Sequence, residues 1–263
     1  MRIITGIAML CCLVLSARGQ TNGPASAPSA TEKAEQIVRR AVEALGGEKY
    51  LAIRSLIGRG LYTPFQDGIS GVPSAFIDYL VYPDRERTEF RTQGIRIIQV
   101  NDGQKGWIYD GAAQTIKEMK PAQIEDFNLA RRTSLENLLR GWWRQEGATL
   151  EYAGRREAGL AQRNETVRLT YPDGLAVEFE FGAKDNLPAK VIYKRKKADS
   201  EEVTEEDRFA QYVTIEGVVV PFIIDHFRQG VQTSRINYES LEINRPIADA
   251  LFAKPASIKE LKK

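Results

Sequence analysis

The sequence predicts a mainly β protein with helices (α+β), in which a large curled antiparallel sheet forms an incomplete β-barrel and helices cover its concave face. Strand-like runs separated by short turns fill most of the chain beyond residue 51, which favours an antiparallel meander. Four or five of these runs precede a helical insertion and about six follow it; an open sheet with that many strands usually curls. Two helical segments, at residues 31–46 and 121–145, supply the covering layer.

The N-terminus has the pattern of a secretory signal peptide. A charged residue, a short apolar run and two small residues, Ala17 and Gly19, stand in the order that signal peptidase recognises. The apolar run is too short to span a bilayer as a helix. We therefore expect residues 1–19 to be cleaved, residues 20–30 to form a flexible leader, and residues 31–263 to form a single periplasmic domain. Retention of the N-terminal segment as an anchor is the alternative.

Cleavage at this point changes the charge and the cysteine content. The full chain has a formal net charge of +2, and loss of Arg2 and Arg18 brings it to zero. Cys11 and Cys12 leave with the same segment, so the mature chain has no disulfide. A neutral chain lacks the basic footprint of a nucleic-acid-binding protein, and no later segment is apolar and long enough to span a bilayer.

The first predicted helix covers residues 31–46. Thr31 suits its N-cap and Gly46 suits the position after its last turn. Its apolar residues recur on one face with helical spacing: Ile37, Val38, Ala41, Val42 and Leu45. This pattern predicts an amphipathic helix that packs against the sheet.

Turn signals divide the strands that follow. Asp102-Gly103 predicts a hairpin, and Pro83 predicts a break between strands because proline cannot donate to a ladder. A basic and an acidic arm at residues 194–207 predict cross-strand charge pairs on an exposed hairpin. Residues 175–181 alternate strictly, with Leu175, Val177, Phe179 and Phe181 on one face and Glu178 and Glu180 on a face that we expect to be wet.

The helical insertion carries two adjacent tryptophans. Thr133 and Glu136 have the spacing of a capping box. Five apolar residues follow at the spacing of one helical stripe: Leu135, Leu138, Leu139, Trp142 and Trp143. The tryptophan pair is core, the wall of a ligand cavity or a membrane contact. The mixed charges around it disfavour the membrane contact, because surface-bound helices are usually basic on their polar face.

The sequence contains no complete catalytic or cofactor motif. His226 is the only histidine, and no Gly-x-Ser-x-Gly elbow accompanies it, so we expect a structural role for it. One histidine without cysteines disfavours a zinc or transition-metal site. Gly58-x-Gly60 lacks the rest of a phosphate loop and is interpreted as close packing against the helical layer. We therefore expect a protein that is not an enzyme and has no cofactor.

The order of several weak motifs resembles the LolA/LolB-like superfamily of periplasmic outer-membrane lipoprotein carriers. The matching stretches are ALGG (44–47), IGRGLY (57–62), DYLVYPDRERTEF (78–90), IQVNDGQKGWIYDG (98–111), TSLENLLRGWWRQ (133–145), DNLPAKVIYKRK (185–196) and INYESLEINRPIADALFAKP (236–255). They span nearly all of residues 31–255. One departure is that Tyr82 precedes Pro83, where the carriers have a basic residue that latches the lid.

The resemblance implies an incomplete barrel with a helical lid over a cavity that shields acyl chains without catalysis. Its partners would be a lipid or an acylated lipoprotein, with inner- or outer-membrane proteins as candidates for loading and release. The candidate wall residues are Trp107, Leu138, Trp142, Trp143, Val177 and Phe179. Ordinary core is the competing interpretation for Trp107 and the two strand residues. The alternative functions are an envelope module that binds or senses a partner protein, and a secreted hydrolase that depends on His226.

Overall fold

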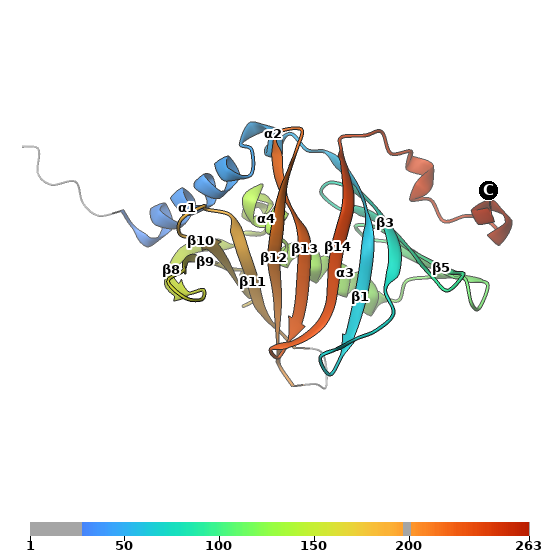
Figure 1. Cartoon of the computed structure of the whole chain (residues 1–263). Coiled ribbons are helices and arrows are strands. Elements are labelled where there is room, and N and C mark those ends of the chain that lie inside the picture. The colour runs from blue at the N-terminus through green and yellow to red at the C-terminus, as the bar shows by residue number, and fades with distance from the viewer. Residues whose placement is uncertain (1–27, 197–200, 263) are drawn as a thin grey trace, which may run out of the picture.

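A computed structural model describes residues 28–196 and 201–262 (Figure 1). The predicted signal peptide and most of the predicted leader lie outside the described residues. Helix α1 (Ala30–Ala44) begins one residue earlier than expected, and Ser29 rather than Thr31 is its N-cap. The Ser29 hydroxyl accepts from the Glu32 amide at 3.2 Å, and the Glu32 carboxylate accepts from the Ser29 amide at 2.7 Å. A short helix, α2 (Glu48–Leu51), follows.

The strands form one large antiparallel sheet that is not closed. They are β1 (Ser55–Gln66), β2 (Ile69–Ser70), β3 (Ser74–Val81), β4 (Arg85–Thr92), β5 (Ile95–Asp102), β6 (Gly106–Asp110), β7 (Thr115–Glu118), β8 (Thr149–Glu157), β9 (Arg163–Thr170), β10 (Ala176–Gly182), β11 (Pro188–Arg195), β12 (Val203–Ile215), β13 (Val218–Arg228) and β14 (Val231–Ile243). The order across the sheet is β7-β6-β5-β4-β3-β1-β14-β13-β12-β11-β10-β9-β8, with β2 paired to β1. The predicted fold class is confirmed.

The pairing of β1 with β14 joins the two halves of the chain at the centre of the sheet. Gly58 and Gly60 lie on this central strand. A side chain at Gly58 would come within 2.6 Å of the Tyr238 ring on β14, and one at Gly60 would strike the Asn237 carbonyl oxygen at a bulge. The two glycines therefore permit close approach to a neighbouring strand. The expectation that they pack against the helices was wrong.

The helical insertion consists of α3 (Pro121–Thr133), α4 (Leu135–Leu139) and a 3-10 helix, η1 (Trp142–Glu146). A second helical segment begins near Thr133, as expected, but its cap and its C-terminal end differ from the prediction. Ser134 has an extended backbone and caps α4 by accepting from the Asn137 amide at 3.1 Å, so the expected Thr133–Glu136 capping box does not form. Gly141 has a left-handed backbone with φ 71°, which ends the helix before the tryptophans.

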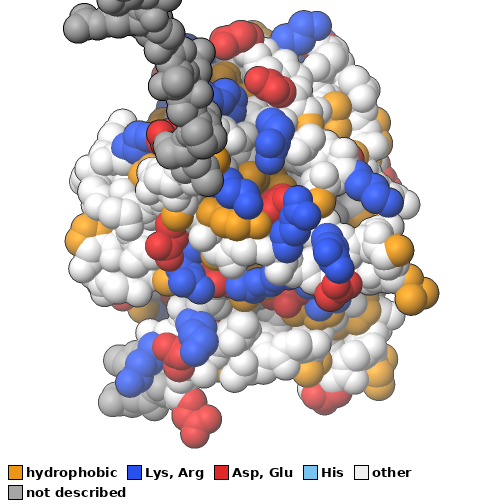
Figure 2. Space-filling model, turned by 90° about the vertical axis from the view of Figure 1, so that its left-hand side faces the viewer, with side chains coloured by type: hydrophobic (Ala, Val, Ile, Leu, Met, Phe, Trp, Pro, Cys, Tyr) orange, Lys and Arg blue, Asp and Glu red, His pale blue; other side chains and the backbone are white. Residues whose placement is uncertain are grey.

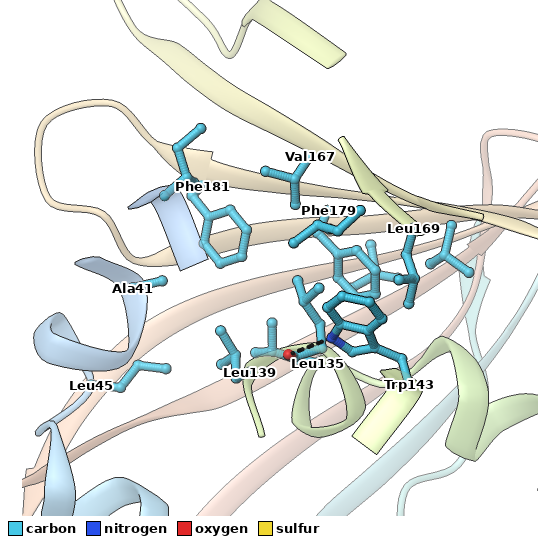
Figure 3. Packing of buried hydrophobic residues seen from close by; sticks show 14 of the residues in the cluster. Ala41, Leu45, Leu135, Leu139, Trp143, Val167, Leu169, Phe179 and Phe181 are labelled. Atoms are coloured by element: carbon cyan, nitrogen blue, oxygen red, sulfur yellow. Dashed lines mark hydrogen bonds between the residues drawn. The ribbon is translucent and has the colours of Figure 1, made fainter. Parts of the chain in front are cut away.

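The main core lies where α1, α4 and η1 pack on strands β8–β11 (Figure 3). The alternation along β10 is confirmed on its apolar face, since Val177, Phe179 and Phe181 are at most 1% exposed. The expectation of a wet opposite face was wrong for Glu180, which is 3% exposed and accepts from Asn164 at 2.8 Å. Glu178 pairs with Arg168 at 2.7 Å. Polar pairs therefore cover this outer face.

A second core lies on the opposite face of strands β4–β6. Its buried members are Ile98, Val100, Trp107, Tyr109 and Phe252. The C-terminal segment, with 3-10 helices η2 (Asp249–Leu251) and η3 (Ile258–Lys262), covers these strands and extends past β3 and β5 in Figure 1. Three side chains of the sheet donate to its carbonyl oxygens: Arg87 to Leu251 at 2.6 Å, Arg96 to Leu261 at 2.7 Å and Trp107 to Phe252 at 3.0 Å.

Charged side chains of both signs share the outer surface. On the face seen in Figure 2, Lys and Arg side chains gather around a hydrophobic area near the centre, and Asp and Glu side chains lie scattered among and around them. The predicted cross-strand charge pairing on the β11–β12 hairpin is confirmed for Lys194, which pairs with Glu202 at 2.9 Å. Residues 197–200 of this hairpin lie outside the described residues.

Candidate functional site

A cleft lies between the concave face of the central strands and the helical insertion. Two adjoining hollows, of about 280 and 440 Å³, share much of their lining. The residues common to both are Leu56, Tyr82, Ala130, Ser134, Glu136, Val220, Pro221 and Ile224. Aliphatic side chains of β1 and β13 thus form the floor, and α3 and α4 form the roof. The size and the apolar lining are typical of small-molecule sites.

The cleft stays open because α3 buries little of its own surface. Thr133 is the one residue of α3 that is fully buried, and the other positions are half-buried or exposed. By contrast, four of the five residues of α4 are buried. The concave face is therefore solidly packed under α1 and α4, and hollow under α3. In Figure 1, α3 lies behind β14 and β1, across the centre of the sheet.

Ion pairs hold α3 at its middle and at its C-terminal end. Arg195 on β11 donates to the Asp126 carboxylate. Arg132 pairs with Asp173 at 2.7 Å and with Glu146 at 2.8 Å. Polar links, rather than a packed apolar face, therefore position this helix over the cleft.

The two tryptophans have different surroundings. Trp143 is 5% exposed within the main core, and its indole N–H donates to the Leu138 carbonyl oxygen at 3.2 Å, the dashed line in Figure 3. Trp142 is half-buried and lines the cleft, with its ring centroid 5.8 Å from that of Tyr82. The Arg140 guanidinium lies 4.5 Å from the Tyr82 ring and 5.6 Å from the Trp142 ring. Arginine and aromatic rings therefore form one end of the cleft.

The other predicted wall residues lie away from this cleft. Leu138, Val177 and Phe179 are completely buried in the main core. Trp107 pairs across the ladder with Val100, which pairs with Arg87. Because Glu86 lines the cleft and successive residues of a strand alternate, this trio faces the opposite side of the sheet. Trp107 lines a separate hollow of about 500 Å³ beside the C-terminal segment.

Buried titratable groups surround the cleft. Burial raises the pKa of the Glu136 carboxyl above its ordinary value, and the charge of Arg140 only partly opposes this effect. Glu136 keeps some exposed surface because it faces the cleft. Burial, and then the charge of Glu136, also raise the pKa values of Tyr50 and Tyr82 well above the usual range. The cleft thus has a low polarity, in which an ionised carboxylate is costly.

Two further carboxyl groups, Glu86 and Asp78, lie on strands of the sheet at the edge of the cleft. Glu86 lines the cleft, and Asp78 on the adjacent strand is 9% exposed. Burial raises the pKa of both groups, and for Asp78 the nearby charge of Glu86 raises it further. The Thr88 hydroxyl lies 2.7 Å from Asp78 and 3.2 Å from Glu86.

The other end of the cleft is formed by paired charges. His226 Nδ1 lies 2.5 Å from Asp207 Oδ1, and Arg228 pairs with Glu205 at 3.0 Å. Burial alone would lower the pKa of His226, but its hydrogen bond to Asp207 and the nearby carboxylates raise it. Within the described residues, no cluster of three or more potential metal ligands occurs, and no helix is long and apolar enough to cross a membrane.

Sequence reasoning missed most of the cleft residues. Tyr50 lies on α2, Tyr82 in the break that Pro83 predicts, and Tyr238 on the last strand. Their positions in the sequence do not reveal that they converge. Glu136 was interpreted as a capping residue, and its place one turn before Arg140 on a helix with apolar neighbours was the available signal.

The described residues thus form an open antiparallel sheet with an apolar cleft beneath helices. No family model and no curated protein matches the chain. Among solved structures, an outer membrane lipoprotein-sorting protein domain from Vibrio parahaemolyticus matches at 13% identity and TM-score 0.55, over 83% of this chain and 97% of that one. A LolA superfamily protein from Nitrosomonas europaea matches at 13% identity and TM-score 0.54, over 84% and 97%. The chain therefore has a LolA-like fold, as the motif order predicted.

Proposed function

We propose that this protein is a non-catalytic periplasmic carrier that holds the acyl chains of a lipid or an acylated lipoprotein. The observation that carries the proposal is the apolar cleft between the central strands and α3. The LolA-like fold supports it, because solved structures with this fold include a lipoprotein-sorting domain. In this proposal residues 1–19 are an export signal, and residues 31–263 act as one binding domain.

Burial of the ligand chain would provide the affinity. Each methylene group removed from water contributes about 0.8 kcal/mol, so about ten buried methylenes contribute roughly 8 kcal/mol before the cost of ordering the complex. No covalent step is needed. Ligand exchange requires only that α3 move away from the floor, and membrane proteins of the envelope would act as donor and acceptor.

The test is native mass spectrometry of the purified protein, followed by organic extraction and lipid analysis. Ala130 on α3 lines the cleft, so Ala130→Trp would fill it and should reduce bound lipid severalfold. Ala122 is an exposed residue of the same helix that does not line the cleft, and Ala122→Trp is the matched control. A protein that neither retains lipid nor takes up added lipid would contradict the proposal and favour a partner-binding module.

A further inference from the structure

The cleft continues into a third hollow beneath the N-terminal half of α3. This hollow has a volume of about 340 Å³ and shares Glu86, Phe127 and Ala130 with the cleft, so the two spaces adjoin. Most of its lining side chains carry hydrogen-bonding groups: Glu86, Thr88, Gln99, Asn101, Gln123 and Asp126. We call it the polar hollow, because the floor of the neighbouring cleft is aliphatic.

The register of the sheet brings four of these polar side chains together. Gln99 on β5 pairs with Thr88 on β4, and Asn101 pairs with Glu86 two residues further along both strands. Because residues two apart on a strand share a face, the four side chains form two adjacent cross-strand pairs on the face that α3 covers. A compact group of amide, hydroxyl and carboxyl side chains therefore continues the apolar floor.

Asn101 has no hydrogen-bond partner, although it is only 9% exposed. Its Oδ1 atom is buried without a partner, and no bond among the described residues uses its amide nitrogen. Gly106, opposite on β6, leaves room for the carboxamide, since a Cβ atom there would lie 2.9 Å from Oδ1. A buried polar group without a partner is costly, and such groups are uncommon unless a ligand or water completes them. The side chain of Asn101 therefore points to a ligand in the polar hollow.

The carboxyl of Glu86 also has unused hydrogen-bonding capacity. The Thr88 hydroxyl lies 2.7 Å from Asp78 and 3.2 Å from Glu86. A hydroxyl has one proton to donate, and the shorter distance assigns it to Asp78. No Lys or Arg lines the polar hollow, and its other carboxylate, Asp126, pairs with Arg195 on β11. A partner for Glu86 must therefore come from a ligand or from solvent.

We propose that the polar hollow binds an uncharged head group with several hydroxyls, as in a sugar, on the amphiphile whose acyl chain fills the cleft. This inference rests on the proposed function and specifies its ligand. A hydroxyl both donates and accepts, so it can pair with the Asn101 carboxamide and with Glu86, whether or not that carboxyl is ionised. An ammonium cannot accept from the amide groups. A sulfate or a phosphodiester cannot donate to the carboxyl, and it would find no cation in the hollow.

Isothermal titration calorimetry with four decyl amphiphiles below their micelle concentrations tests the head group at constant chain length. The probes are decyl glucoside, decyl tetraethylene glycol, decylammonium and decyl sulfate. We expect decyl glucoside to bind about tenfold more tightly than each of the others, which is the scale of one or two added hydrogen bonds. Decyl tetraethylene glycol controls for lack of charge, because its head has ether oxygens and a single hydroxyl.

Asn101→Leu replaces the carboxamide with an apolar group of similar size. It should lower the affinity for decyl glucoside about tenfold and leave the other three probes unchanged. A side chain without partners does not stabilise the fold, so urea unfolding should show this variant to be at least as stable as the wild type. Lost stability would indicate a structural asparagine and contradict the proposal. Asn128→Leu is the matched control, since Asn128 is half-buried on α3 and lines neither the cleft nor the polar hollow.

The outcomes separate the two proposals. Equal affinity for decyl glucoside and decyl tetraethylene glycol, or tighter binding of either charged probe, overturns the hydroxyl-bearing head and leaves an apolar carrier intact. Binding of none of the four overturns both. If Asn101→Leu does not fold, the wild-type ranking and Glu86→Gln still decide, because loss of the carboxyl should weaken decyl glucoside alone. Mass and monosaccharide analysis of the ligand extracted from the protein distinguishes a sugar head from a glycerol head, the two sources of this chemistry.

Discussion

His226, the only histidine in the chain, lies at the polar end of the cleft, and its pKa depends on the charges there. Its pKa is raised above the ordinary value because Asp207, at 2.5 Å, outweighs the effect of burial. We expect Asp207→Asn to lower the pKa of His226. Proton NMR titration of untagged protein measures it directly, because a single histidine gives a single pair of imidazole C–H signals. An unchanged titration in Asp207→Asn would show that the pair does not set the charge of this ring.

The raised pKa of His226 also makes the free energy of unfolding depend on pH. The pKa of His226 is higher in the folded protein than the unfolded value of about 6.5. The pair's stabilisation is therefore complete below that unfolded pKa and is lost as pH rises through the folded pKa. Urea unfolding of the wild type and of His226→Gln should thus differ most in acidic solution and converge above neutrality. A difference that grows with rising pH contradicts the raised pKa.

Single residues also mark the limit of sequence reasoning. The burial of Val177 and Phe179 follows from strict alternation, which is a local property of one strand. The environment of Glu136 does not, because it depends on burial in the folded protein and on the charge of Arg140, a side chain that hydrogen bonds to α2 hold in place. A site that is formed by segments far apart in the sequence produces no periodic pattern in any one of those segments.

At the scale of elements, helix α4 illustrates how a correct pattern led to a wrong boundary. The apolar spacing from Leu135 to Trp143 fits one helical stripe, and four of its five residues are indeed buried. Gly141 nevertheless interrupts the helix, and the turn sends Trp142 towards the cleft and Trp143 into the core. The spacing of apolar residues indicates which side chains are buried, but it does not indicate whether the backbone between them remains helical.

The C-terminal segment is an element whose role the sequence did not reveal. Phe252 is 7% exposed and packs with Trp107 in the second core. We expect Phe252→Ala to destabilise the protein by about 3 kcal/mol, the usual scale for removing a buried phenylalanine ring. Ile69, which is 73% exposed, provides the control, since Ile69→Ala should change stability by less than about 0.5 kcal/mol.

Urea unfolding measures both variants. If Phe252→Ala costs no more than the control, the C-terminal segment does not seal this face of the sheet. Tryptophan fluorescence supplies a second readout, because loss of the segment would expose Trp107 to water. Trp143 lies in the other core and should be unaffected.

At the scale of the whole molecule, the presence of a cleft depends on how closely each helix packs on the sheet, and not on the order of the strands. The strand order was predictable from short turns and a curled meander, although the pairing of β1 with β14 joins residues far apart in sequence, such as Leu56 and Ile243. Whether the concave face is filled or hollow depends on how much surface α3 buries. That quantity follows from tertiary contacts, and α3 itself has only a weak apolar periodicity.

The ion pair between Arg195 and Asp126 fastens α3, the roof of the cleft, to strand β11. We expect Arg195→Gln to speed hydrogen exchange within residues 121–133 and to accelerate ligand release, because few apolar contacts otherwise resist opening of this helix. Global stability should change by less than about 1 kcal/mol, the usual limit for a partly exposed pair. Hydrogen-exchange mass spectrometry measures the first effect, and stopped-flow displacement of a fluorescent fatty acid measures the second.

Lys194→Gln is the matched control for this prediction. Lys194 is the preceding residue on the same strand and pairs with Glu202 on the exposed hairpin, so its loss leaves α3 untouched. Faster exchange throughout the protein in Arg195→Gln would indicate general destabilisation and not a released roof. Unchanged exchange in α3 together with unchanged ligand release would mean that other contacts hold the helix closed. Faster exchange confined to α3 in Arg195→Gln alone would identify this pair as the bond that must open before an acyl chain can enter or leave the cleft.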